Sequence, residues 1–292
     1  MLYTIENKHI RLTVSNHGAE IKSLVFDNVE RIHDSNPAFW NRSAPLLFPC
    51  IGTITNKETI INDKAYALSK HGFLRDQDFE LVSIDDHTIV LKFHSNETTL
   101  AMYPFTFEVI VKYEIENKKM LSSVNITNLS HEPMPFNFGL HPAFKTPISE
   151  DEKFEDYELV VHSSKDHPIY KVELSNGTIN FDEVVRTINF SKPLPLNYDD
   201  YLGDALVFDN IDFDEITLQD SKGTHGVSFT FPGFPMLGIW TPSPKRAPFI
   251  CLEPWIGCAD PTTHDGMFIH KKHMIVLNTS ESKEITYTWR FF

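Results

Sequence analysis

Apolar and polar residues alternate with a period of two along residues 105–115. Because successive side chains of a β-strand point to opposite faces of its sheet, this period predicts a strand with one buried face. The alternation recurs near both ends of the chain and in its middle, at Ile10, Leu12 and Val14, at Val124 and Ile126, and at Ile285, Tyr287 and Trp289. Strands along the whole length predict an all-β fold.

Short polar segments separate the predicted strands, at residues 62–63, 85–87 and 116–118. Each contains Asn or Asp, which tolerate the positive φ of tight turns, so these segments are predicted to close hairpins. The 18 prolines interrupt long helices and favour loops. We therefore predict a large antiparallel β-sandwich. Since no linker or repeat divides the chain, we expect one domain over residues 1–292.

Composition narrows the class of partner. The 26 basic and 40 acidic residues give a net charge of −14, which repels nucleic-acid phosphates and predicts no nucleic-acid partner. No segment has the roughly 20 apolar residues of a membrane span, so we expect no membrane association and a cytoplasmic location. Cys50, Cys251 and Cys258 lack CxxC spacing, which predicts reduced thiols without a disulfide framework or a structural zinc site.

Polar residues suited to chemistry stand next to apolar segments at five places. Arg42 precedes the run 46–49, and its guanidinium is either a surface ion pair or a planar donor to ligand oxygens. His71 precedes Gly72, which permits a close approach of ligand or backbone, although such a histidine taken alone is more often a loop residue with satisfied hydrogen bonds. Asp204 leads into an apolar strand and is either a turn residue or a ligand-binding acid.

Two of the five places give a stronger signal. His141 stands between apolar residues and Pro142, where a charged side chain is costly without a partner. Glu253 follows four strand-like residues and precedes Pro254 and Trp255. A glutamate in such surroundings is rarely buried without a partner, and apolar neighbours raise its pKa toward values useful for a general base.

Taken in order, the five places resemble the aldose 1-epimerase (mutarotase) family over nearly the whole chain. The matching segments are residues 41–42, 71–73, 139–144, 204–206 and 251–255. The sequences around His71 and Glu253 and at the C-terminal end of the chain are more similar to the LacX-like and hexose-6-phosphate epimerase branches than to galactose mutarotase proper. In the galactose enzymes the pattern around the second histidine is usually His-Thr/Pro-Tyr-Phe, whereas residues 141–144 read His-Pro-Ala-Phe, which leaves the identity of the sugar open.

The resemblance implies a galactose mutarotase-like β-sandwich with an open cleft for a pyranose and no metal or organic cofactor. Glu253 would take the proton of the anomeric hydroxyl, and His141 would protonate the ring oxygen. His71, Arg42 and Asp204 would hold the ring oxygen and hydroxyls. Trp240 either covers the apolar face of the sugar or is a core residue.

The hexose-phosphate branch also implies a role for Arg75. With Arg42, and with Lys245 or Arg246, it would hold a 6-phosphate in an otherwise acidic protein. The alternative is a surface arginine paired with Asp76 or Asp78. The expected partner is thus a small sugar or sugar phosphate, and the protein is expected to be a monomer or homodimer.

Two other classes of function are compatible with parts of the sequence. A non-catalytic sugar-binding or sensing protein would use the same cleft, but it has no need of an acid and a base together. A metal-dependent cupin-type isomerase is suggested by 14 histidines and by His270 and His273. Residues three apart in a strand point to opposite faces, so these two histidines are not expected to share an ion.

Overall fold

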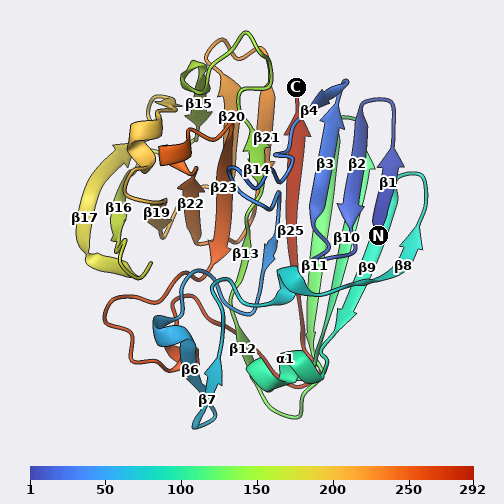
Figure 1. Cartoon of the computed structure of the whole chain (residues 1–292), viewed down its shortest axis with the longest axis vertical. Coiled ribbons are helices and arrows are strands. Elements are labelled where there is room, and N and C mark those ends of the chain that lie inside the picture. Colours follow the sequence, from blue (N-terminus) through green and yellow to red (C-terminus); the bar gives the residue numbers. More distant parts are fainter.

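Strands make up nearly all the regular structure of the computed structural model, which describes all 292 residues (Figure 1). The α-helix α1 (Glu97–Met102) has six residues. The other helical segments are short 3₁₀ turns at Thr55–Lys57, Leu74–Asp76, Phe154–Asp156, Tyr198–Tyr201, Ser243–Lys245 and Phe268–His270. None of these helices has the length and apolarity needed to cross a membrane. The predicted all-β fold is confirmed.

Nine antiparallel strands form the larger sheet. In order across the sheet they are β18 (Leu194–Pro195), β15 (Tyr157–Val160), β20 (Glu215–Asp220), β21 (Gly226–Thr230), β25 (Ser282–Phe291), β11 (Lys119–Asn128), β10 (Phe107–Glu116), β9 (Thr88–His94) and β8 (Glu80–Ile84). Along β10, buried residues alternate with partly exposed ones, as the period of two predicts. The turn before β11 contains Asn117 at φ 51°, and the turn from β6 (Glu58–Ile61) to β7 (Lys64–Ala67) has positive φ at Asn62 and Asp63.

The second large sheet has eight antiparallel strands and carries the site described below. In order they are β17 (Ile179–Asn189), β16 (Asp166–Val172), β19 (Leu206–Asp209), β22 (Met236–Trp240), β23 (Phe249–Ile256), β13 (Phe138–Leu140) and β5 (Leu46–Leu47), and β14 (Ala143–Lys145) also pairs with β23. All eight residues of β23 are buried. It is therefore a central strand with a neighbour on each side.

Aromatic side chains join the two large sheets. The ring of Phe144 on β14 lies 6.0 Å from that of Phe229 on β21 and 5.0 Å from that of Trp289 on β25. A small sheet of β1 (Leu2–Glu6), β2 (Ile10–Ser15), β3 (Ile21–Phe26) and β4 (Val29–Glu30) lies beside β9, β10 and β11 (Figure 1). The Tyr113 hydroxyl on β10 donates to the Ala19 carbonyl at 2.8 Å, which ties this sheet to the larger one.

The main apolar core runs through these layers and includes residues from both ends of the chain, such as Ile5 and Phe291. The remaining strands, β12 (Met134–Phe136) and β24 (Ile275–Leu277), form a separate antiparallel pair. The three cysteines are buried free thiols, as their spacing predicted.

Trp289 provides a test of the contact between the large sheets, because its side chain is only 1% exposed. Trp289→Ala should lower the free energy of unfolding by about 3–5 kcal/mol, since it removes a large buried ring and leaves a cavity. Urea denaturation followed by circular dichroism measures the change. Leu2→Ala on β1, where the residue is 65% exposed, should change stability by less than about 0.5 kcal/mol. Similar losses for both variants would contradict this packing.

Candidate active site

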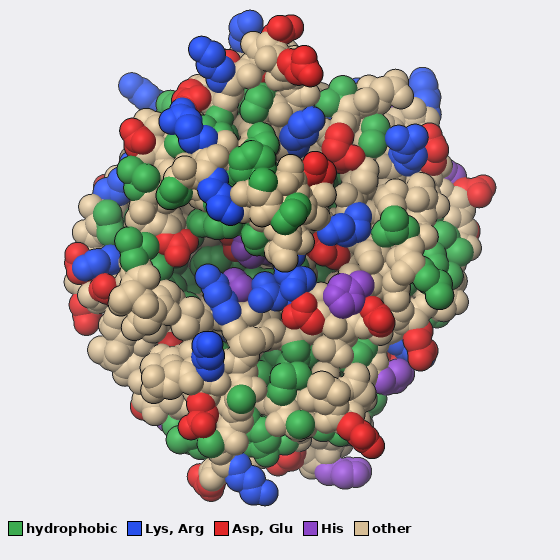
Figure 2. Space-filling model, viewed as in Figure 1, with side chains coloured by type: hydrophobic (Ala, Val, Ile, Leu, Met, Phe, Trp, Pro, Cys, Tyr) green, Lys and Arg blue, Asp and Glu red, His purple; other side chains and the backbone are tan.

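A cavity of about 450 Å³ lies on the face of the eight-stranded sheet that is turned away from the main core. Ile250 and Leu252 of β23 belong to that core. Because side chains alternate along a strand, Cys251, Glu253 and Trp255 face the other way. Glu253 and Trp255 line the cavity. In Figure 2 the corresponding face is hollowed near its centre, with histidine side chains inside the hollow and basic side chains along its rim.

Strand register brings His141 opposite Glu253. Gly139 pairs with Trp255, and Ala143 pairs with Cys251. His141 lies midway between Gly139 and Ala143, and Glu253 lies midway between Cys251 and Trp255, so the two residues stand opposite each other. Nε2 of His141 lies 3.1 Å from Oε2 of Glu253. Their side chains are 8% and 3% exposed, which places an acid–base pair on the floor of the cavity.

Burial shifts the pKa of both members toward the neutral form. It raises the pKa of Glu253 well above 4.5, with the nearby Asp204 adding to the rise and Lys70 opposing it. Burial also lowers the pKa of His141 well below 6.5, and the positive charges of Arg75 and Lys70 lower it further. Two groups whose pKa values move toward each other are suited to exchanging a proton near neutral pH.

Aromatic rings enclose His141 on two sides. The Trp40 ring stacks on the imidazole at 4.6 Å between centroids, and Trp240 meets it edge-on at 5.8 Å. Both tryptophans line the cavity and are partly exposed. They offer apolar faces to a ligand and keep water away from the histidine.

His71 is held by two hydrogen bonds to Gly52. Its backbone N–H donates to the Gly52 carbonyl at 3.0 Å, and its ring Nδ1 lies 3.1 Å from the Gly52 N–H, which donates to it. Burial lowers the pKa of His71 well below 6.5, and His141 and Arg75 add to the shift. Because the neutral ring accepts at Nδ1, its proton is on Nε2, which makes this atom a hydrogen-bond donor for a ligand.

Gly72 is needed for that placement of His71. Both residues have positive φ, 67° for His71 and 69° for Gly72. A Cβ at residue 72 would lie 2.1 Å from the Phe48 carbonyl oxygen. Only glycine allows this close approach of two backbone segments. Of the two alternatives for Gly72, a close approach of a ligand or of backbone, the structure shows the approach of backbone.

Two cations stand at one wall of the cavity. Lys70 is exposed, and Arg75 is 17% exposed, with its Nη2 donating to the Lys70 carbonyl at 2.8 Å. The Nε of Arg75 is buried without a hydrogen-bond partner, and its nearest carboxylate contact, to Asp76, is long at 3.9 Å. Asp78 instead pairs with His17. The guanidinium of Arg75 is therefore not saturated by acids of its own loop.

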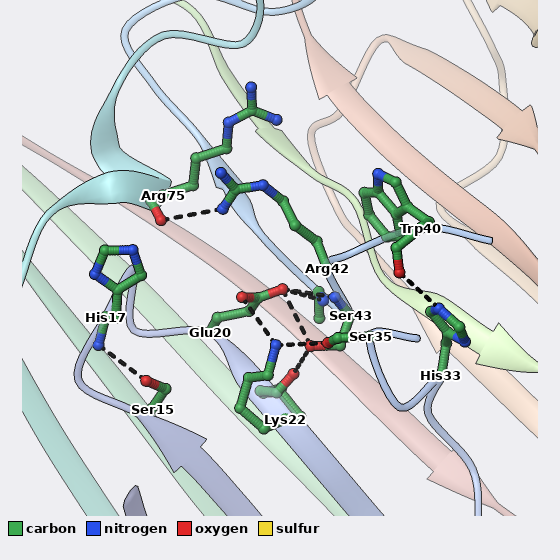
Figure 3. A network of polar contacts seen from close by, with 12 residues as sticks. Ser15, His17, Glu20, Lys22, His33, Ser35, Trp40, Arg42, Ser43 and Arg75 are labelled. Atoms are coloured by element: carbon green, nitrogen blue, oxygen red, sulfur yellow. Dashed lines mark hydrogen bonds and ion pairs between the residues drawn. The ribbon is translucent and has the colours of Figure 1, made fainter. Parts of the chain in front are cut away.

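Arg42 lies next to Arg75 (Figure 3) and is not one of the residues that line the cavity. Its Nη2 pairs with Asp76 at 2.5 Å, and its Nη1 donates to the Arg75 carbonyl at 3.3 Å. In the structure Arg42 thus forms an ion pair, which was one of the two alternatives for this residue. A direct contact between Arg42 and a sugar stays a prediction.

A buried carboxylate fixes the segment that carries Trp40 and Arg42 (Figure 3). Glu20 accepts hydrogen bonds from the backbone N–H groups of Ser43 and Ala44, at 2.6 and 3.0 Å, and pairs with Lys22 at 3.3 Å. The carbonyl of Trp40 also contacts Nε2 of His33 at 2.9 Å. These bonds hold the segment against β3 and so position the Trp40 ring over His141.

The other predicted site residues are divided between the cavity and the surface. Asp204 lines the cavity at φ 77°, and its Oδ1 accepts from the Ala205 N–H at 2.9 Å. Lys245 donates to the Phe39 carbonyl, and Arg246 pairs with Glu155 at 2.8 Å. Neither Lys245 nor Arg246 lines the cavity.

Potential metal ligands come together at one place. Donor atoms of His141, Cys251 and Glu253 lie within 4.8 Å of one another, and all three residues are buried. By contrast, His270 pairs with Asp265, and His273 pairs with Asp209. The two histidines of the cupin alternative are therefore committed to different carboxylates.

Sequence reasoning missed four residues that shape the cavity: Trp40, Gly52, Lys70 and Trp255. Lys70 and Trp255 adjoin motif residues and could have been found by extending each motif by one or two positions. Trp40 shortly precedes Arg42 and had a similar signal. Gly52 gave no chemical signal, because its contribution is a backbone N–H to a residue 19 positions away.

Comparisons with known proteins indicate the family of this chain. A family model described as aldose 1-epimerase matches residues 1–286. The chain is 29% identical over 293 aligned positions to the chromosomal protein LacX of Lactococcus lactis subsp. lactis, covering 97% of each.

Solved structures give the same result. A galactose mutarotase related enzyme from Lactobacillus acidophilus is 31% identical, with a TM-score of 0.95 over 100% of this chain and 97% of that one. A galactose mutarotase-like protein from Lactobacillus casei ATCC 334 is 30% identical, with a TM-score of 0.90 and full coverage of both chains. On the match of sequence, fold and motif order over its whole length, this chain belongs to the aldose 1-epimerase family.

Proposed function

We propose that this protein is a mutarotase, which interconverts the α and β anomers of a hexose or a hexose phosphate. The observation that carries the proposal is the buried pair of His141 and Glu253, 3.1 Å apart on the floor of a cavity large enough for a pyranose. Membership of the aldose 1-epimerase family supports it. A non-catalytic sugar-binding protein is the alternative, and it differs in having no use for this pair.

The pair supplies the two proton transfers that anomer exchange needs. In the reactive form Glu253 is a carboxylate and His141 an imidazolium, which together carry the one proton that the pair shares. Glu253 takes the proton of the anomeric hydroxyl while His141 gives its proton to the ring oxygen, and the bond from C1 to the ring oxygen breaks. Rotation about the bond between C1 and C2 and reclosure with the roles reversed give the other anomer and restore both groups.

Other cavity residues would position the sugar. Nε2–H of His71 can donate to the ring oxygen or a hydroxyl, and the free carboxylate oxygen of Asp204 can accept from hydroxyls. The rings of Trp40 and Trp240 can cover apolar C–H faces of the pyranose. Arg42 would act by fixing Arg75 and Asp76 through its two contacts.

A phosphorylated sugar is the substrate class that best uses the cationic wall. Lys70 and the incompletely paired Arg75 offer positive charge inside a protein whose net charge is −14. A guanidinium and an ammonium at one wall suit phosphate oxygens, whereas a neutral hexose has no charge for them to bind.

Activity is tested by polarimetry or anomer-resolved proton NMR on freshly dissolved α-D-glucose, α-D-galactose and their 6-phosphates. Glu253→Gln and His141→Asn should each lower kcat by about 10²- to 10⁴-fold, because each removes one of the two proton-transfer groups. Glu116→Gln and His131→Asn change exposed residues that do not line the cavity and should leave the rate unchanged. Wild-type binding of a sugar without any rate difference between wild type and Glu253→Gln would favour the binding protein.

The substrate class is tested by comparing KM for a hexose 6-phosphate with KM for the neutral hexose. Arg75→Ala and Lys70→Ala should each raise the first by about tenfold or more, since a hydrogen bond to a charged group contributes about 1.5–3 kcal/mol, and should leave the second nearly unchanged. The ratio of KM values is the readout, because loss of either cation also changes the electrostatics of the pair. Lys64→Ala, an exposed lysine on β7, is the control. Equal effects on both substrates would exclude phosphate binding at this wall.

Glu253 should also make stability depend on pH. Because its pKa is higher in the folded protein than the reference 4.5, the native state keeps a proton that the unfolded chain releases. The free energy of unfolding therefore falls as pH rises from about 4.5 through the raised pKa. Glu253→Gln has no such proton, so its stability relative to wild type should increase with pH over this window.

Urea denaturation at a series of pH values from acid to neutral measures that difference. The lowered pKa of His141 acts in the opposite sense, since it adds stability as pH rises toward 6.5, and it is present in both proteins. Glu116→Gln should show no trend relative to wild type. A Glu253→Gln curve parallel to the wild-type curve would mean that burial does not raise the pKa of Glu253.

A further inference from the structure

Cys251 lies beside the catalytic pair and has no part in the proposed reaction. It precedes Glu253 by two residues on β23, so both side chains leave the strand on the same face. Donor atoms of Cys251, Glu253 and His141 lie within 4.8 Å of one another. Cys50 and Cys258, which are equally buried, are not part of this cluster.

The three groups have spare bonding capacity. His141 has one ring nitrogen beside Glu253 and the other, Nδ1, buried without a hydrogen-bond partner. Cys251 is a free thiol with 0% exposure. A bound ion would therefore displace no hydrogen bond at His141 Nδ1. It would give one of the two ring nitrogens, Nδ1 or Nε2, a partner.

The donor set matches zinc. One sulfur, one imidazole nitrogen and one carboxylate oxygen are the ligands that Zn²⁺ uses in tetrahedral sites, with a fourth position left for water or a ligand. The three donor atoms lie within 4.8 Å of one another, so an ion centred among them is at most about 2.8 Å from each, and zinc bonds are about 2.0–2.3 Å long. Each side chain thus needs to move by less than about 1 Å.

Charge also favours a divalent ion. The Cys251 thiolate and the Glu253 carboxylate supply two negative charges, so Zn²⁺ with a neutral His141 forms a centre without net charge, as a buried site requires. The thiol proton, and the proton shared by His141 and Glu253, would leave to solvent on binding. Lys70 and Arg75 on the cavity wall oppose the ion, which makes both anionic ligands necessary.

We propose that His141, Cys251 and Glu253 form a zinc-binding site that opens onto the cavity at its fourth coordination position. The ion is not needed for anomer exchange. It occupies both proton-transfer groups, so zinc binding and sugar turnover exclude each other. The exclusion rests on the proposed mutarotase function, whereas the metal site itself does not.

Binding is measured on the wild-type protein without reference to activity. Calorimetric titration with Zn²⁺ should give one ion per chain. Titration with Co²⁺, a spectroscopic substitute, should produce a near-ultraviolet thiolate-to-cobalt charge-transfer band. Absence of that band overturns the proposal whether or not any variant folds.

Cys251→Ala separates this site from histidines on the surface. It should weaken zinc binding by at least about 100-fold, the upper end of the loss seen when supporting groups around a metal are removed, and should abolish the cobalt band. Cys258→Ala, which removes another buried thiol, should leave both unchanged. Equal zinc affinity in wild type and Cys251→Ala would show surface binding only and would overturn the proposal.

Activity gives an independent readout. Zn²⁺ should inhibit wild-type mutarotation, and EDTA should restore it, while Cys251→Ala should keep the basal rate and lose the inhibition. Zinc binding with a cobalt band in a protein that accelerates no sugar would uphold the metal site and refute the mutarotase function. Full wild-type activity with zinc bound at one ion per chain would overturn the exclusion and with it this assignment of ligands.

Discussion

The antiparallel pairing of β23 with β22, β13 and β14 is the constraint on which the site depends. The strand is buried along all eight residues, so its hydrogen bonds and register are fixed by neighbours on both sides. A slip of one residue would turn Ile250 and Leu252 toward the cavity and Glu253 into the apolar core. The cost of burying that carboxylate without His141 therefore protects the register that brings the two residues together.

The floor and the wall of the cavity differ in their exposure to water. On the floor, Glu253 and His141 are almost fully enclosed, and exclusion of water moves both toward their neutral forms. At the wall, Lys70 is exposed, and its positive charge acts on both members of the pair. A ligand phosphate bound there would reduce this field, so binding of the substrate and proton affinity of the pair are coupled through electrostatics.

The sequence predicted those features that repeat at short range. Alternation along β10 and the Asn117 turn follow from neighbouring residues, and both are confirmed. His141 and Glu253 became candidate site residues because a polar residue within an apolar segment requires a partner. Their pairing with each other needed the register of β23 with the β13–β14 segment, which local patterns do not contain.

Other features depend on contacts between distant segments. The hydrogen bond from the Gly52 backbone to His71 and the network of Glu20 beneath Trp40 join loops that sequence reasoning treated separately. For Arg42, its position in the sequence left both an ion pair and a ligand contact open, and the structure shows an ion pair with Asp76. The roles of these residues toward a sugar stay predictions, as does the treatment of the chain as one domain.

The shape of the cavity follows from small residues as much as from polar ones. Gly238 on β22 pairs with Glu253, and a Cβ at residue 238 would lie 2.5 Å from the Trp255 ring. The missing side chain lets that indole lie across β22 next to the carboxylate. Cys251 is paired in the same way with Trp240, under an aromatic cover that also includes Trp40. On β22, Glu253 thus has a small neighbour, Gly238, and Cys251 has a large one, Trp240. This difference in size leaves space above the acid–base pair.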